Sequence, residues 1–156
     1  MDQVQIYFDP DKIEKVMFNL LSNAFKHTSP GGTINVTVSL TYLTSQELET
    51  EDEGRSGEYV QIAVRDTGSG IDDGRKEHIF DRFYQGKSSE KNVYTGTGIG
   101  LSLSRELIKL HQGRIFLKSQ VGIGTEITIQ FPVIKADPES PDQQPAEVLQ
   151  YQEPDE

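Results

Sequence analysis

The chain contains no cysteine, few basic residues and no long apolar run among its 156 residues. Without cysteine it cannot form disulfides or thiolate zinc sites, and its redox compartment cannot be inferred from thiols. None of its apolar stretches approaches the ~20 residues that a membrane-spanning helix needs. It also lacks a basic stripe that would neutralise nucleic-acid phosphates. We therefore expect no nucleic-acid partner and no direct membrane contact.

The excess of acidic residues is unevenly distributed along the chain. The net charge is −10, and residues 136–156 hold seven acidic residues and no basic one. Residues 41–58 hold six acidic residues and one basic residue. We expect residues 43–58 to form a long solvated loop. Residues 135–156, rich in Pro, Glu, Asp and Gln, are expected to be a linker or disordered tail, because they cannot bury enough apolar surface to fold. Residues 1–134 then form one domain.

Hydrophobic periodicity and turn residues predict helices and strands between residues 3 and 133. Asp9 and Pro10 are typical of a helix start, and Gly113 is expected to end a later helix in a left-handed conformation. Strands that follow one another as hairpins, with helices between them, favour an α+β fold. We predict a two-layer α/β sandwich, with a mixed sheet of about five strands and three helices on one face. The expected strands cover residues 3–8, 33–42, 59–65, 114–119 and 125–133, and the helices begin at residue 10, within 72–84 and at 101.

The first helix carries a polar face beside its apolar stripe. Asn19, Asn23, Lys26 and His27 are spaced i, i+4, i+7 and i+8, so they share one side of the helix. Amide oxygens can ligate Mg²⁺, which takes few protein ligands and keeps waters and phosphate oxygens. Lys26 can act as a point charge on phosphate. The alternative is a solvated helix face that binds nothing.

Two glycine motifs follow along the chain. Residues 66–70, Asp-Thr-Gly-Ser-Gly, come directly after a strand, where a carboxylate can accept from an exocyclic amine such as adenine N6. Residues 96–101, Gly-Thr-Gly-Ile-Gly-Leu, lead into a helix whose N-terminal N–H groups favour anions. The second motif is neither a Rossmann fingerprint nor a Walker loop. Taken singly, the first could be an ordinary turn and the second a flexible loop.

The order and spacing of these motifs resemble the catalytic, ATP-binding domain of sensor histidine kinases. That domain belongs to a wider group that includes DNA gyrase, the MutL repair proteins and the ninety-kilodalton heat-shock chaperone. Residues 79–84, Ile-Phe-Asp-Arg-Phe-Tyr, resemble the F box, which separates histidine kinases from the gyrase and chaperone branches. The other matches are the N box at 19–28, the G1 box at 66–71, the G2 box at 96–101 and the last glycine motif at 122–125.

The resemblance implies a Mg-ATP site. Asn23 would ligate Mg²⁺, and Asn19 would orient water or metal in catalysis, because an amide cannot take a proton. Lys26 would touch phosphate, His27 would lie over the ribose–phosphate region, and Asp66 would read the adenine amine. Residues 85–99 would form a lid, with Lys87 and Lys91 as candidate phosphate contacts, and Phe80 and Phe83 would anchor the lid, dock a partner helix or simply pack in the core. The other implied nucleotide contacts are Gly68, Gly70, Ile71, Phe83, Gly96, Thr97, Gly98, Ile99, Gly100, Leu101 and Thr125, the last supporting Asp66 through water.

The resemblance also implies a reaction and partners. The chain would donate the γ-phosphoryl group of ATP to a histidine on a separate dimerisation and phosphoacceptor domain, since none of His27, His78 and His111 lies in the acceptor motif. The parent would be a homodimer and a membrane-bound sensor, with this domain in the cytoplasm and a receiver domain downstream. An ATPase of the gyrase or chaperone class, a degenerate docking module and an anti-sigma-type serine kinase are the alternatives. An ATPase would need a glutamate in place of Asn19.

Overall fold

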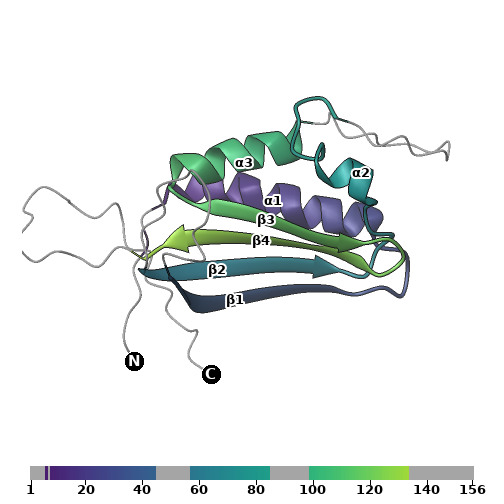
Figure 1. Ribbon diagram of the computed structural model, residues 1–156, viewed down its shortest axis with the longest axis horizontal. Helices are drawn as coiled ribbons and strands as arrows, with labels where there is room; N and C mark the ends of the chain where they lie inside the picture. The colour runs from purple at the N-terminus through teal and green to yellow at the C-terminus, as the bar shows by residue number, and fades with distance from the viewer. Residues whose placement is uncertain (1–5, 7, 45–56, 85–98, 134–156) are drawn as a thin grey trace, which may run out of the picture.

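Four strands and three helices make up the part of the chain that the structure describes. The structure is a computed structural model, and it describes residue 6 and residues 8–44, 57–84 and 99–133 (Figure 1). In chain order the elements are α1 (Pro10–His27), β1 (Ile34–Leu43), β2 (Gly57–Asp66), α2 (Asp73–Lys76), α3 (Gly100–Leu110), β3 (Arg114–Gln120) and β4 (Gly124–Pro132).

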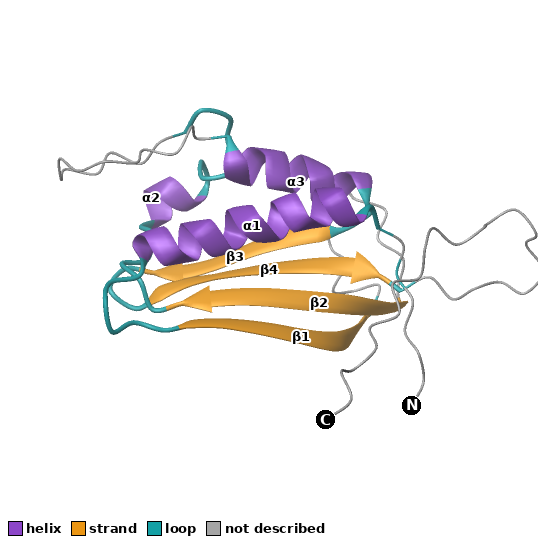
Figure 2. Cartoon of the chain, turned by 180° about the vertical axis from the view of Figure 1, so that it is seen from behind, coloured by secondary structure: helices purple, strands orange, loops and turns teal. Residues whose placement is uncertain are grey.

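The strands form one sheet with the order β1-β2-β4-β3, and the helices lie on one of its faces (Figures 1 and 2). This confirms the predicted α+β sandwich. The sheet has four strands instead of about five, and it is antiparallel instead of mixed. Hairpins fix the pairs β1–β2 and β3–β4 as antiparallel, and β2 and β4 also run in opposite directions. The predicted strand at 3–8 falls mostly outside the described residues, and Ile6 and Phe8 are not in a strand.

Helix α1 begins where the sequence predicts. The Asp9 carboxylate accepts hydrogen bonds from the N–H groups of Asp11 and Lys12, and Pro10 occupies the first turn. Thr28 caps the other end of α1. Pro30 follows shortly after, and a proline disfavours helical backbone in the residue before it, here Ser29. Helix α3 ends at Leu110, two residues earlier than the predicted helix, which runs from residue 101 to 112.

The predicted left-handed stop at Gly113 is wrong. The positive φ, 56°, falls on Gln112, one residue earlier. Glycine is required at position 113 for a different reason. A Cβ atom there would lie 2.8 Å from side-chain atoms of Ile108 and Phe131, which is too close for either to remain in place.

Two contacts fix how α1 and α3 run beside each other. At one end the Asp9 N–H donates to His111 Nε2 over 3.0 Å, while His111 Nδ1 lies 2.6 Å from the carbonyl oxygen of Leu107. At the other end Asn19 contacts Gly100. The helices are therefore antiparallel, and only the first half of α1 lies along α3. The second half, with the polar face from Asn23 to His27, continues past the start of α3.

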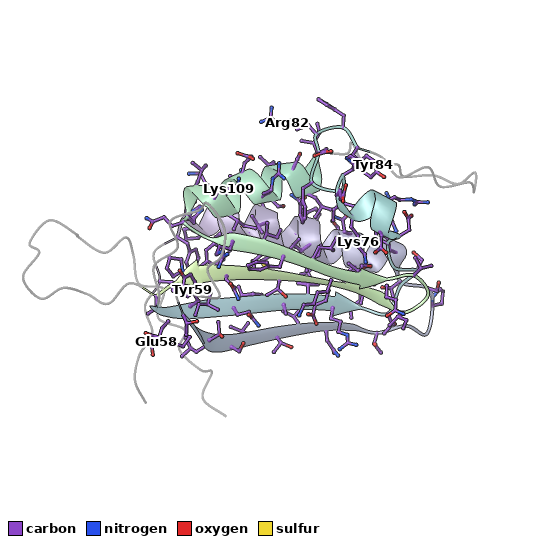
Figure 3. The ribbon with its side chains drawn as sticks, in the orientation of Figure 1. Glu58, Tyr59, Lys76, Arg82, Tyr84 and Lys109 are labelled. Atoms are coloured by element: carbon purple, nitrogen blue, oxygen red, sulfur yellow. The ribbon has the colours of Figure 1, made fainter. Side chains whose placement is uncertain are left out.

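The core lies between the helix layer and the sheet, and side chains fill this space (Figure 3). Cross-strand rows on the inner face, such as Val64 beside Ile127, pack under the helices. Strand β1 lies mostly beyond them, so Val36, Val38 and Leu40, which alternate along it, remain 49–66% exposed. None of the helices in the described residues is long and apolar enough to cross a membrane. The buried core residues are Ile13, Val16, Leu20, Ala24, Val64, Leu107, Ile108, Ile127, Ile129 and Phe131.

Truncating Leu20 tests this core. Leu20 is 1% exposed, so Leu20→Ala should lower the free energy of unfolding by about 3 kcal/mol. Leu110 is also on a helix but is 72% exposed. Leu110→Ala should therefore change the free energy of unfolding by only about 0.5 kcal/mol. Urea denaturation followed by circular dichroism measures both values. Equal losses in the two variants would contradict the packing described above.

Candidate functional site

The turn after β2 packs against the C-terminal end of α1. The Ser69 N–H donates to the carbonyl oxygen of His27 over 3.4 Å. A Cβ atom on Gly68 would lie 2.4 Å from the same carbonyl oxygen, so only glycine permits this approach. On its other side the turn is held by Thr67, whose hydroxyl accepts from the Thr33 N–H over 2.9 Å. The G1 motif therefore lies at the end of the polar face of α1.

The same turn also packs tightly against the β3–β4 turn. The Gly122 N–H donates to the carbonyl oxygen of Ser69 over 2.8 Å. Gly70 has φ +71°, and a Cβ there would lie 2.0 Å from the carbonyl oxygen of Gln120. A Cβ on Gly124, at φ +142°, would lie 2.0 Å from the carbonyl oxygen of Asp66. Two glycine motifs that are far apart in the sequence therefore fix each other's backbone.

Three polar side chains form a row across the sheet at this end. Asp66, Thr125 and Ser119 lie directly opposite one another on β2, β4 and β3. They continue the inner face of the sheet, the face of Val64 and Ile127. Asp66 is only 7% exposed, and its Oδ1 accepts from the Gly68 N–H over 2.8 Å. This buried carboxylate can accept a further hydrogen bond from a ligand amine, as the sequence predicts.

Asn19 links the start of α3 to the middle of α1. Its Nδ2 donates to the carbonyl oxygen of Gly100 and to Ser104 Oγ, both over 3.2 Å. Asn23, one turn later, is half-buried and makes no side-chain hydrogen bond within the described ranges. Its amide is therefore available to a ligand. The start of α3 contacts Asn19 and the G1 turn contacts His27. Because the eight residues between these two positions span about 12 Å of helix, the two segments lie about that far apart along α1.

The N-terminus of α3 has features that favour an anion. Its N-cap residue, Ile99, has no side chain that caps the first turn, and that turn contains no acidic residue. The N–H groups of the first turn and the helix dipole favour a negative charge at this end. Ile99, Gly100 and Leu101 thus lie where the sequence predicts a phosphate cradle. Gly96, Thr97 and Gly98, and also Lys87 and Lys91, fall outside the described residues.

The charge of His27 is controlled by its surroundings. Desolvation lowers the pKa of the imidazole, and the Lys26 cation lowers it further, while the Asp66 carboxylate acts in the opposite direction. The side chain is nevertheless exposed, so water still reaches part of the ring. Since the pKa is shifted down from about 6.5, the neutral imidazole is the main form at pH 7. Lys26 then supplies the positive charge on this face.

The F-box aromatics lie in two different environments. The Arg105 guanidinium lies over the Phe80 ring, 5.9 Å from its centroid, which connects this segment to α3. Phe83 is 72% exposed with φ 64°, so it is not a core aromatic. No motif or spacing in the sequence pointed to Arg105. Ser119 was also missed, although the alternation of β3 places it on the same face as Ile115 and Leu117.

The residues present allow only a metal site with few protein ligands. No group of three His, Cys, Asp or Glu side chains in the described part of the chain could hold an ion. An amide oxygen of Asn23 together with ligand phosphates would be the donor set of a Mg²⁺ ion that keeps its waters. A shallow hollow of about 360 Å³ borders Ile71 and Ser119, and neither Asn23 nor Asp66 lines it.

Comparison with known proteins identifies the family. Residues 8–135 match the model of the histidine kinase-, DNA gyrase B-, and HSP90-like ATPases. The chain belongs to this family. The resemblance inferred from the sequence motifs is thereby confirmed.

Within this ATPase family the relatives are histidine kinases. The chain is 37% identical over 135 residues to the adaptive-response sensory kinase SasA of Synechococcus sp., covering 86% of this chain and 32% of SasA. It is 37% identical over 125 residues to the hybrid signal transduction histidine kinase D of Dictyostelium discoideum, covering 80% of this chain and 7% of that kinase. The solved catalytic domain of histidine kinase ThkA, in a nucleotide-free form, matches with TM-score 0.61 and 25% identity, covering 85% of this chain and 75% of that one. The chain thus spans less than a third of the length of either kinase relative.

Alanine at Gly70 and at Gly122 tests the contact between the two turns. Both glycines have positive φ, +71° and +77°, so both variants lose about 1 kcal/mol from backbone strain. Only Gly70 faces a nearby backbone atom, whereas nothing lies within 4 Å of a Cβ on Gly122. Gly70→Ala should therefore lower the free energy of unfolding by roughly 3 kcal/mol in total, because the Gln120 backbone must move. Chemical denaturation would contradict this contact if Gly122→Ala were equally destabilising.

Proposed function

We propose that this histidine-kinase ATPase domain binds Mg-ATP and donates the γ-phosphoryl group to a histidine on a separate phosphoacceptor domain. The observation that carries the proposal is the position of three groups along one face of α1. The buried carboxylate of Asp66 lies near one end of this helix, and the N-terminus of α3 lies against Asn19. The side-chain amide of Asn23, which has no hydrogen-bond partner among the described residues, lies between them. A ligand with an amine-bearing ring and a phosphate chain matches this order.

Each group has a separate role in the proposed reaction. Asp66 accepts from the adenine amine, with Gly68, Gly70 and Ile71 against the ring and Thr125 beside the carboxylate. Asn23 would hold Mg²⁺, which supplies charge neutralisation on the phosphates. Lys26 adds a positive charge, and the N–H groups of α3 bind phosphate oxygens. Phosphoryl transfer requires positioning and charge stabilisation more than covalent chemistry from the protein.

The arrangement of Asn19 supports transfer over hydrolysis. Its Nδ2 is bound to Gly100 and Ser104, so the side chain is held in one orientation with Oδ1 as its only free acceptor. An amide oxygen can orient a water or a metal-bound water, but it is too weak a base to take a proton from water. An ATPase mechanism would need a carboxylate at this position.

The acceptor and the regulatory partners lie outside the described residues. The proposed nucleophile is a histidine imidazole of a dimerisation domain, in a parent protein that is a homodimer. The same proposal includes a downstream receiver domain and a membrane-bound parent that holds this domain in the cytoplasm. It also includes Phe83 as a contact of the nucleotide or of the partner helix. The exposed position of Phe83 supports a contact with another molecule.

Removing Asn23 or Asp66 should weaken nucleotide binding. We expect Asn23→Ala and Asp66→Asn each to raise the dissociation constant of Mg-ADP at least tenfold, because the first removes the proposed Mg²⁺ ligand and the second replaces the carboxylate that accepts from the adenine amine by a neutral amide. Asn35→Ala, on the exposed face of β1, is the matched control and should leave the constant unchanged. Isothermal titration calorimetry measures all three. Binding that survives both site substitutions would disprove the proposed site.

The reaction itself needs the acceptor domain. With γ-labelled ATP and a separately purified phosphoacceptor domain of the parent, the unsubstituted chain should produce acid-labile, alkali-stable label on that domain. The chain alone should remain unlabelled. Steady phosphate release without labelled protein would favour an ATPase instead.

A further inference from the structure

The hydroxyl of Ser119 makes three short contacts behind the site. Its Oγ lies 2.8 Å from the Ile71 nitrogen, 3.0 Å from the Gly124 carbonyl oxygen and 2.8 Å from Thr125 Oγ1. Ser119 itself lies outside the motifs that define the proposed nucleotide contacts. It nevertheless contacts two of those residues, Ile71 and Thr125, and it is in the same cross-strand row as Asp66.

The chemistry of these partners fixes the direction of each hydrogen bond. A serine hydroxyl has one proton and two acceptor lone pairs. The Ile71 N–H can only donate, so it uses one lone pair of Ser119, and the Gly124 carbonyl can only accept, so it receives the Ser119 proton. The second lone pair then remains for Thr125, which must be the donor. The opposite direction, from Ser119 to Thr125, would remove the hydrogen bond to Gly124 and leave two bonds instead of three.

This arrangement determines what Thr125 presents to a ligand. Its only proton points to Ser119, so toward any other group its oxygen can act only as an acceptor. The Asp66 carboxylate beside it also only accepts. The pair therefore favours an amino group, or a water that directs its protons to both oxygens. The base edge of adenine carries an amine at position 6, whereas guanine carries a carbonyl acceptor there. The carbonyl oxygen of guanine would face the two acceptor oxygens of Thr125 and Asp66 without a proton between them, which is unfavourable.

We propose that Ser119 is a positioning residue that gives the site its preference for 6-aminopurine over 6-oxopurine nucleotides, acting through the proton of Thr125. This inference rests on the proposed nucleotide-binding function. Ser119 does not touch the base. Without its hydroxyl, the Thr125 proton is free to turn toward the site and donate to a carbonyl, so discrimination between the two bases falls.

The test measures the preference, not binding alone. Calorimetric titration of the chain with Mg-ADP and with Mg-GDP gives the ratio of the two dissociation constants. We expect Ser119→Ala to lower the preference for ADP roughly fivefold to tenfold, the effect of about one hydrogen bond. Ser119→Thr keeps the hydroxyl and should stay within about twofold of the unsubstituted chain, which separates the role of the hydroxyl from damage to strand β3.

Thr67→Ala is the matched control. The Thr67 hydroxyl also anchors the G1 turn, through the Thr33 N–H, but no contact joins it to Thr125 among the described residues. Thr67→Ala should therefore weaken ADP and GDP equally and leave their ratio unchanged. If Ser119 acts through Thr125, the double variant Ser119→Ala/Thr125→Val should show the same ratio as Thr125→Val alone.

The outcomes separate the two proposals. An unchanged ratio in Ser119→Ala, with ADP still bound, would overturn the role of Ser119 and leave the nucleotide site intact. An equal fall of the ratio in Thr67→Ala would also overturn the role of Ser119, because loosening of the G1 turn would then explain the lost preference in both variants. If the unsubstituted chain bound neither nucleotide, the proposed function would fail and this inference with it.

Discussion

The site depends on the close approach of three backbone segments around the end of strand β2. The turn after Asp66 lies against the carbonyl of His27 on one side and against the β3–β4 turn on the other. Side chains at Gly68, Gly70 or Gly124 would prevent this approach. Once the backbone is fixed here, the carboxylate of Asp66 is held under the end of α1, where a ligand bound to the polar face of that helix can reach it.

The rest of the fold places α1 so that its polar face remains open. The buried stripe of α1 packs on the inner face of the sheet, and its first half lies along α3, between the Asp9–His111 and Asn19–Gly100 contacts. The second half continues beyond α3. Among the described residues, core packing and helix pairing thus leave Asn23, Lys26 and His27 at least partly exposed, near the N-terminus of α3 and a buried carboxylate. A surface that unites a cation, an amide and free N–H groups suits a phosphate-bearing ligand.

Local signals in the sequence predicted most of the helices and strands. Asp9-Pro10 fixed the start of α1, and the spacing of Asn19, Asn23 and His27 placed them on one face. The features that depend on contacts distant in sequence were not predictable. The Asn19–Gly100 hydrogen bond joins residues 81 apart, and the role of Ser119 follows from the register of three strands. The helix end differed from expectation because packing of Phe131 and Ile108, not a left-handed turn, requires glycine at position 113.

The central claim is that the amide of Asn23, the turn after Asp66 and the start of α3 contact a single nucleotide. The most direct test is a titration of the isotope-labelled chain with Mg-ADP, followed by nuclear magnetic resonance of the backbone amides. The account predicts that the signals of Asn23, Gly68 and Leu101 shift together and yield one dissociation constant. Shifts confined to one of these three segments, or three different constants, would contradict it.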